Sequence, residues 1–116
     1  MYIIMEYFKQ CSELKSIIEN MNDRMSCEEN KSKPILPEED VSKLMYMLVR
    51  GLCHIHENGI VHRDLKTENC LIDSELNLRI IDFGLAKRVI PNEVMNKPNG
   101  TPYYIAPEVL KGSYTT

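Results

Sequence analysis

The sequence has no excess of positive charge and no long apolar run, and these two absences exclude several classes of protein. Its 14 lysine and arginine residues stand against 17 aspartate and glutamate residues, which gives a formal net charge of -3. Nucleic-acid binding usually needs a concentrated basic surface, so this balance argues against a nucleic-acid partner. No apolar stretch approaches the roughly 20 residues of a membrane helix. We therefore expect neither nucleic acid nor a membrane as a partner.

Paired cysteines and an N-terminal targeting segment are also lacking. None of the four cysteines has the spacing of a zinc site or a redox pair. They are Cys11, Cys27, Cys53 and Cys70. Residues 1–5 are apolar, but the run is too short for a signal peptide, carries no basic flank and meets Glu6 at once. We expect free thiols in a reducing compartment, which is the cytoplasm or alternatively the nucleus.

Glycine is scarce, and its spacing excludes one phosphate-binding device. A Gly-rich phosphate loop needs several glycines within a few residues, whereas the five glycines of this chain stand far apart. They are Gly51, Gly59, Gly84, Gly100 and Gly112. The chain therefore supplies no Gly-rich loop.

Two charged runs are present: His62-Arg63-Asp64-Leu65-Lys66-Thr67-Glu68-Asn69 and Asp82-Phe83-Gly84. Together they hold what phosphoryl transfer requires, which is a proton acceptor, a cation and metal ligands in fixed positions. Asp64 can accept the proton of an acceptor hydroxyl, and Lys66 can neutralise the migrating phosphate. Asn69 and Asp82 can hold magnesium. These four are the predicted catalytic residues, and the last two are the predicted metal ligands.

A third run, Gly100-Thr101-Pro102-Tyr103-Tyr104-Ile105-Ala106-Pro107-Glu108, follows at a suitable distance. The three runs stand in the order found in the eukaryotic protein kinases, and the chain resembles that family. Lys66 and Thr101 match its serine/threonine type. The resemblance implies a partial protein-kinase-like α+β fold with a hinge strand, the first part of the mainly helical C-lobe, a short β-hairpin and an activation segment. It also implies ATP and Mg²⁺ as cofactors and protein hydroxyls as acceptors.

By this resemblance the whole chain is one partial kinase domain made of consecutive segments. The segments are 1–8 (last N-lobe strand and hinge), 9–61 (C-lobe helices with a polar insertion near 22–34), 62–81 (catalytic loop and hairpin), 82–108 (activation segment) and 109–116 (a truncated end). The Gly-rich loop, the N-lobe lysine and the later C-lobe helices have no counterpart. Because positioning is most of the catalysis, we expect the isolated chain to be inactive.

The resemblance places an ATP site on both sides of the catalytic loop. Met5 takes the gatekeeper position, the hinge lies at 6–8, and two apolar side chains pack at the adenine. The implied ATP-binding residues are Glu6, Phe8, Leu71, Ile81, Lys66 and Asp82. Taken alone, the pattern over 2–7 predicts a buried strand, and a simple core strand without a ligand is the alternative.

Three residues match family positions that meet the protein substrate: Glu13, Glu68 and Thr101. A glutamate at the position of Glu13 often lies near the ribose and basic substrate side chains, but an ordinary acid in the first turn of a helix explains it equally. Glu68 can pair with a substrate arginine or can be a solvated loop carboxylate. Thr101 matches a threonine that contacts the catalytic aspartate and lysine. We expect protein substrates, basic ones among them.

Five further residues are expected to shape the site: His62, Arg63, Phe83, Gly84 and Glu108. We expect His62 to pack on Phe83 rather than to act as a general acid or base. Gly84 would give the backbone beside Asp82 its freedom to turn. Glu108 ends the Ala-Pro-Glu motif.

The stretch from Leu85 to Gly100 contains no serine, threonine or tyrosine. No local hydroxyl can therefore carry the phosphate that usually pairs with basic residues such as Arg63. Glu93 offers a permanent carboxylate in its place. With the run from Gly100 onward, this pattern resembles the calcium- and calmodulin-dependent kinase group, especially the calcium-dependent kinases.

Local patterns predict the remaining elements. We expect a helix over 12–21 with Ser12 as its cap, then a polar loop over 22–34. A longer helix over 37–57 carries an apolar stripe for the core. The stripe consists of Val41, Leu44, Leu48, Leu52 and Ile55, widened by Met45 and Met47. Strands over 70–73 and 78–81 flank a turn whose acids alternate as in a calcium loop, but Leu78 replaces the required glycine, so we expect no calcium site.

The leading prediction is a piece of a serine/threonine protein kinase whose parent uses ATP and magnesium. Two alternatives stay open. One is a non-catalytic module that binds a kinase partner or competes for its substrates. The other is an incomplete gene model.

Overall fold

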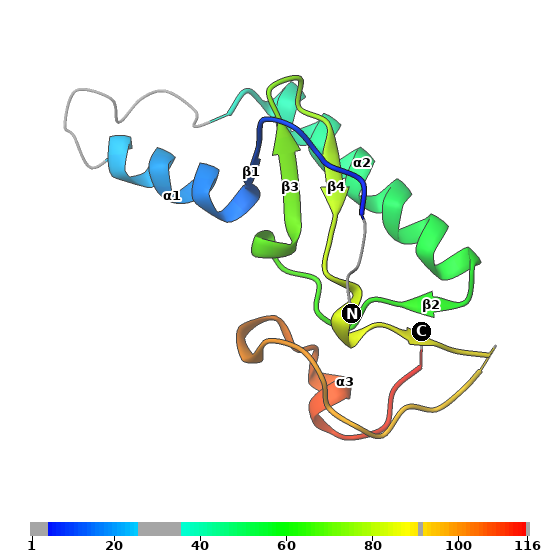
Figure 1. Ribbon diagram of the computed structural model, residues 1–116. Coiled ribbons are helices and arrows are strands. Elements are labelled where there is room, and N and C mark those ends of the chain that lie inside the picture. The colour runs from blue at the N-terminus through cyan, green and yellow to red at the C-terminus, as the bar shows by residue number, and fades with distance from the viewer. Residues whose placement is uncertain (1–4, 26–35, 91, 116) are drawn as a thin grey trace.

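The computed structural model describes residues 5–25, 36–90 and 92–115. The three-stranded sheet and the two longer helices form its upper part, and residues 92–115 lie below them (Figure 1). The elements are β1 (Cys11–Glu13), α1 (Leu14–Met25), α2 (Glu38–Glu57), β2 (Ile60–Val61), β3 (Cys70–Asp73), β4 (Leu78–Ile80), β5 (Lys87–Arg88) and α3 (Pro107–Leu110). This mixture of helices and antiparallel strands is the α+β class that the sequence predicted.

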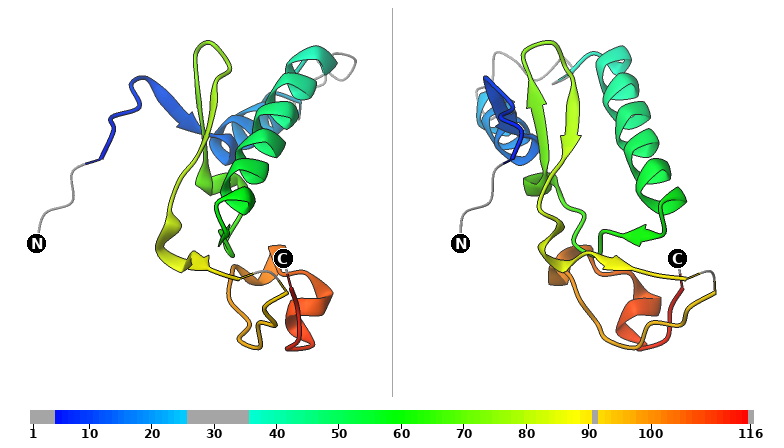
Figure 2. Two further views of the ribbon diagram at one scale, coloured as in Figure 1. Left: turned by 90° about the vertical axis from the view of Figure 1, so that its right-hand side faces the viewer. Right: turned by 45° about the vertical axis from the view of Figure 1, so that its right-hand side comes forward.

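The core forms around the predicted hairpin of β3 and β4. Cys70 and Ile72 alternate onto the buried face of β3, and Ile72 stands opposite Leu78 of β4. Leu44 of α2 completes this buried cluster. Apolar side chains of both long helices pack around it, so the hairpin lies between α1 and α2 (Figure 2). The packing removes apolar surface from water and holds the end of β4, from which the next catalytic run leaves.

The turn of the hairpin is built on Asp73. Its carboxylate accepts hydrogen bonds from the backbone N–H groups of Glu75 and Asn77, both at 2.9 Å, and from the Asn77 side chain at 2.9 Å. These bonds lower the pKa of Asp73, and the bonds from Asn77 make the largest contribution. The alternating polar residues therefore serve to close the turn, an arrangement typical of Asx turns.

Helix α2 begins one residue later than predicted, with Pro37 at its N-cap position and three acidic residues in its first turn. Leu44 and Ile55 are buried, as expected. The prediction for the rest of the stripe was partly wrong, because Val41 is 43% exposed and Met45 is 52% exposed. The hairpin is narrower than the apolar face of the helix and covers only part of it. Within the described part of the chain, no helix is long and apolar enough to cross a membrane.

Two predictions at the start of the chain were wrong. Ser12 does not cap a helix: it lies in β1, opposite Ile72 of β3, and α1 starts at Leu14 and continues to Met25. Pairing with β3 competes with the local helical pattern and determines the conformation. The first four residues of the predicted loop over 22–34 are therefore helical, and the others lie outside the described residues.

The predicted buried strand over 2–7 is only partly described. Its described residues form no strand, and Met5 and Tyr7 are 81% and 83% exposed. No neighbouring strand among the described residues pairs with them, and a strand becomes buried only within a sheet. Met5, which the resemblance places at the gatekeeper position, is therefore solvent-exposed in this chain, and its role beside an adenine stays a prediction.

The chain that follows the hairpin lies below it (Figure 2). Strand β5 pairs with β2, and the Val89 N–H donates to the Gly59 carbonyl at 2.8 Å. Farther on, Met95 and Tyr114 form an antiparallel bridge and are both buried. This bridge joins the two ends of the segment that contains α3. The run from Gly100 to Glu108 belongs to this segment and lies beneath the catalytic loop (Figure 2).

Candidate active site

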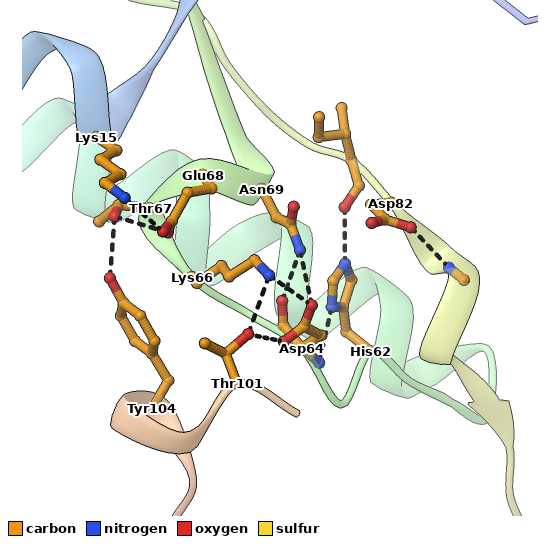
Figure 3. A network of polar contacts seen from close by, with 12 residues as sticks. Lys15, His62, Asp64, Lys66, Thr67, Glu68, Asn69, Asp82, Thr101 and Tyr104 are labelled. Carbon is orange, nitrogen blue, oxygen red and sulfur yellow. Dashed lines mark hydrogen bonds and ion pairs between the residues drawn. The ribbon is translucent and has the colours of Figure 1, made fainter. Parts of the chain in front are cut away.

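Asp64 lies at the centre of a network of polar side chains (Figure 3). The Thr101 hydroxyl donates to Asp64 Oδ1 at 2.7 Å, and Lys66 Nζ lies 2.9 Å from Asp64 Oδ2. Asn69 Nδ2 donates to the Asp64 backbone carbonyl at 2.8 Å and approaches Oδ2 at 3.4 Å. The structure therefore brings together three of the four predicted catalytic residues and the predicted threonine contact.

These contacts keep Asp64 charged. The hydrogen bond from Thr101 is the largest cause that lowers the pKa of Asp64, and Lys66 lowers it further against the opposing effect of partial burial. The hydrogen bond to Asp64 in turn raises the pKa of Lys66, and the negative charges of Glu68 and Asp82 contribute. At neutral pH the pair is thus an aspartate and a lysinium, with Asp82 close enough to act on the same cation.

His62 joins the two catalytic runs from inside. It is 2% exposed, and its Nδ1 accepts from the Asp64 backbone N–H at 3.3 Å. Because Nδ1 accepts, Nε2 carries the hydrogen and donates to the Ile81 carbonyl at 2.9 Å. Its ring meets the Phe83 ring edge-on, with centroids 4.9 Å apart. With both nitrogens bound to backbone, His62 holds Asp64 and the residue before Asp82 in position and is not free for proton transfer.

Asp82 has a left-handed backbone, with φ 59 and ψ 77. Its Oδ1 accepts from the Gly84 N–H at 3.0 Å. A Cβ atom on Gly84 would stand 2.9 Å from that oxygen. The predicted reason for Gly84 was therefore wrong: the positive φ belongs to Asp82, and a side chain at position 84 would instead force the Asp82 carboxylate to shift from the place where it accepts from the Gly84 N–H.

The ligand chemistry at Asn69 and Asp82 fits magnesium. Asn69 gives its NH₂ group to Asp64, so its amide oxygen points away from that residue (Figure 3). Asp82 uses one oxygen for Gly84. Amide and carboxylate oxygens are the hard ligands that Mg²⁺ takes, often only one or two from protein with phosphates and waters for the rest. Accordingly, no group of three or more His, Cys, Asp or Glu residues in the described ranges could hold a metal by itself.

Arg63 and Gly100 make a contact that sequence reasoning missed. Gly100 has φ +119, and a Cβ atom there would stand 2.8 Å from the Arg63 carbonyl oxygen. Arg63 itself has φ 65, and its Nε donates to the Leu85 carbonyl at 2.7 Å. The glycine-threonine pair in the third run was the available signal, since a glycine in such a position often marks close backbone approach.

The predicted partner of Glu93 was wrong. Its carboxylate pairs with Lys87 of β5 and accepts from the Ile90 N–H at 3.2 Å, whereas Arg63 contacts the Leu85 carbonyl. The bond to Lys87 is the first cause that lowers the pKa of Glu93. Lys87 is closer along the chain, so the short loop that joins it to Glu93 closes at little entropic cost.

The predicted substrate residues Glu68 and Glu13 are found in unexpected surroundings. Glu68 is neither free nor merely solvated, because Lys15 of α1 lies 3.1 Å from its Oε1. Glu13 is exposed in β1, opposite Leu71, so the alternative of an acid in the first turn of the helix was wrong. Lys15 was not foreseen, and nothing in its local sequence distinguishes it from an ordinary surface lysine.

The predicted adenine-side residues gather around Arg79 of β4. Arg79 pairs with Glu6 at 3.2 Å and lies over the Phe8 ring at 4.8 Å, and it stands opposite Leu71 in the hairpin. Ile81 follows directly, and its N–H donates to the Asn69 carbonyl at 2.9 Å. Arg79 thus connects Glu6, Phe8 and Leu71, of which Glu6 is solvent-exposed, whereas Ile81 is connected to the catalytic loop through Asn69.

A cavity of about 340 Å³ lies on another side of the catalytic loop. Asp64 and Thr101 contribute to its wall, as do Leu52 of α2 and apolar residues of the C-terminal segment. The residues Glu6, Phe8, Leu71, Ile81 and Asp82 do not line it. The cavity and the predicted ATP site therefore have only the catalytic loop in common.

Glu108, which was expected to shape the site, lies in the first turn of α3 and is exposed.

Comparison with known proteins identifies the family. The model of the protein kinase domain matches residues 1–116. The SNF1-related protein kinase catalytic subunit alpha KIN12 of Arabidopsis thaliana is 36% identical over 111 residues, which is 96% of this chain and 20% of that protein. The serine/threonine-protein kinase PLK4 of Xenopus laevis is 43% identical over 85 residues, 72% of this chain and 9% of that protein.

A third relative is the phosphorylase b kinase gamma catalytic chain, liver/testis isoform, of Bos taurus. It is 42% identical over 81 residues, which is 70% of this chain and 20% of that protein. The chain thus spans between 9% and 20% of the length of these curated relatives. With a family match over its whole length and the catalytic loop assembled around Asp64, the chain belongs to the protein kinase domain family and has a partial protein-kinase-like fold.

Proposed function

We propose that this chain is the catalytic-loop part of a serine/threonine protein kinase, whose parent transfers the terminal phosphate of ATP to protein hydroxyls with magnesium. The observation that carries the proposal is the simultaneous contact of Asp64 with Thr101, Lys66 and Asn69. Family membership supports the reaction class. The cytoplasmic or nuclear location expected from the sequence stays a prediction.

Asp64 is the proposed base. A carboxylate has about four lone-pair sites, and the three side-chain contacts leave it able to accept one more hydrogen. In the proposed step, the substrate hydroxyl oxygen forms a bond to the terminal phosphorus, the bond from that phosphorus to the bridging oxygen of ADP breaks, and the hydroxyl proton passes to Asp64. The lowered pKa of Asp64 keeps it ready to accept at neutral pH.

Lys66 and Thr101 are the proposed positioning and charge-neutralising groups. Lys66 Nζ donates to the Thr101 hydroxyl at 3.0 Å as well as pairing with Asp64, so it keeps a third hydrogen for a phosphate oxygen. Thr101 in turn orients Oδ1 of Asp64. The three side chains therefore place a negative and a positive charge side by side. The negative charge suits the acceptance of the hydroxyl proton, and the positive charge suits the neutralisation of the phosphoryl group that moves to the substrate oxygen.

Asn69 and Asp82 are the proposed magnesium ligands. Bound Mg²⁺ supplies neutralisation of the phosphate oxygens. The chain holds its two oxygen ligands through backbone contacts: Asn69 through the Asp64 carbonyl, and Asp82 through the Gly84 N–H and the His62 bond to Ile81. Glu6, Phe8, Leu71 and Ile81 are the proposed residues on the adenine side.

Transfer of labelled terminal phosphate from ATP to a serine peptide tests the proposal. We expect activity from the complete parent and none above background from the isolated chain. Asp64→Asn in the parent should lower kcat by about 10²–10⁴-fold, the contribution of a general base. Full activity of that variant, with folding intact, would reject Asp64 as the base.

A non-catalytic binding module is the second candidate, and one observation favours it. Met5, Tyr7, Val41, Met45 and Val49 are large apolar side chains that the described structure leaves exposed. Such surface promotes association. The two candidates separate in one experiment: a parent that never transfers phosphate, yet associates with an active kinase through this chain, supports the module and rejects the enzyme.

A further inference from the structure

Both carboxylate oxygens of Glu68 are already occupied within the chain. Oε1 accepts from Lys15 Nζ at 3.1 Å, and Oε2 accepts from the Thr67 hydroxyl at 3.2 Å. The Tyr104 hydroxyl lies 3.1 Å from Thr67 Oγ1 (Figure 3). Helix α1, the catalytic loop and the turn before α3 therefore meet at one anion.

The hydrogen bonds in this group run in one direction. The Thr67 hydroxyl has a single hydrogen, and it points to Glu68, which as a carboxylate can only accept. Tyr104 must therefore donate to Thr67. A chain of donors, from Tyr104 through Thr67, ends on Oε2 of Glu68, and Lys15 donates to Oε1 of the same carboxylate. Successive hydrogen bonds in such a chain polarise one another, and this stabilises the charged carboxylate that accepts the last of them.

Charge supports the same arrangement. The hydrogen bond to Glu68 is the main cause that raises the pKa of Lys15. The pKa of Glu68 is lowered first by its own backbone N–H and next by Lys15, with Thr67 adding to the effect. Lys15 also approaches Glu19, but at 3.9 Å, so Glu68 is its nearer partner.

We propose that Lys15 and Thr67 are specificity-determining residues that occupy Glu68 and so disfavour a basic substrate side chain beside the catalytic loop. The inference rests on the proposed kinase function and deepens it. An incoming guanidinium would have to displace the Lys15 ammonium and would meet its like charge, and Thr67 blocks the two-point contact that arginine makes with a free carboxylate. The substrate class is therefore a serine or threonine segment with a neutral side chain opposite Glu68.

Peptide binding by the full 116-residue chain tests this. The probes are serine peptides in which one arginine is moved through the three positions before the serine, each paired with the same peptide carrying neutral, isosteric citrulline. The measured quantity is the ratio of the citrulline Kd to the arginine Kd. We expect a ratio within about twofold of one for the unchanged chain, and a rise of about two- to fivefold for Lys15→Met, the range typical of an exposed ion pair.

Matched variants and a second readout separate the outcomes. Lys15→Arg keeps the charge and Glu19→Gln removes only the longer contact, so both should leave the ratio unchanged, whereas Thr67→Val added to Lys15→Met should raise it further. A ratio that Lys15→Met does not change, or a preference for arginine above about twofold in the unchanged chain, overturns the proposal. If no variant binds any peptide, the proposed substrate role of this surface is rejected. Titration of the carboxylates by NMR then tests whether Lys15 occupies Glu68. Lys15→Met must raise the pKa of Glu68, and an unchanged pKa rejects that ion pair.

Discussion

The backbone of Gly100 lies against the Arg63 carbonyl oxygen so closely that a Cβ atom on Gly100 would stand 2.8 Å from it. The next residue, Thr101, donates its hydroxyl to Asp64, the neighbour of Arg63, at 2.7 Å. Two backbones in contact thus determine how far the Thr101 hydroxyl stands from Asp64. Residues 37 positions apart in sequence share one short bond because of that approach.

Gly100→Ala tests this contact. The added methyl group must push the two backbones apart, and overpacking of this kind costs about 1–3 kcal/mol beyond the cost of the positive φ itself. We expect a lower free energy of unfolding in urea. Gly112→Ala is the matched control, because Gly112 also has a positive φ of 76 but a Cβ there would approach only the Asn96 carbonyl at 3.8 Å. Equal losses in the two variants would contradict the proposed close approach.

Thr101→Val should raise the pKa of Asp64, because the Thr101 hydrogen bond is the largest cause of its lowered value. A lowered folded-state pKa contributes stability that is present above the unfolded pKa and is lost as the pH falls through the folded one. The variant should therefore lose about 1–2 kcal/mol at pH 7 and less at pH 3, as a lost bond to a charged group would cause. Urea unfolding across that range measures it. Thr101→Ser keeps the hydroxyl and should retain the pH dependence.

His62→Phe separates a structural role from a chemical one. The change keeps an aromatic ring beside Phe83 but removes both hydrogen bonds, which leaves the Ile81 carbonyl without its partner. Loss of a hydrogen bond to a partly buried carbonyl costs about 1 kcal/mol, and we expect a loss of at least that size in urea unfolding. His56→Phe changes an exposed histidine and should remain within about 0.5 kcal/mol of the unchanged chain. Unchanged stability of His62→Phe would show that the ring does not hold the two runs together.

Glu93→Gln should loosen the start of the activation segment, because Glu93 contacts both Lys87 and the Ile90 N–H. We expect amide exchange at Ile90 to become about two- to fivefold faster, since exposed ion pairs contribute little each. The pKa of Glu93 is lowered by Lys87, so the protection should be present above the usual glutamate pKa and be lost as the pH falls through the lowered value.

Two variants test which basic residue matters to Glu93. Lys87→Met should reproduce the faster exchange at Ile90, and Arg63→Lys should not, because Arg63 contacts the Leu85 carbonyl instead. The reverse result would restore the pairing of Glu93 with Arg63 that the sequence suggested.

Local signals predicted the elements well where the pattern and the packing agree. The long helix was placed to within one residue, since proline, first-turn acids and apolar spacing all point to it. The hairpin was also predicted, because alternation in the run from Cys70 places Cys70 and Ile72 in the core. The strand at the start of the chain was not predicted, because Ser12 follows a helical pattern locally but pairs with Ile72 in the folded protein.

The sequence by itself determined the family, and it supplied the predicted catalytic residues, because residue types at short, ordered spacings define both the family's motifs and the chemistry proposed for them. Only the tertiary structure decided the partners: Glu93 with Lys87 instead of Arg63, Glu68 with Lys15, and Gly100 against Arg63. Those pairs depend on distances between segments that no local pattern encodes. An ion pair or a backbone contact forms wherever packing of the whole chain happens to bring its members within reach, and the spacing in sequence does not record that.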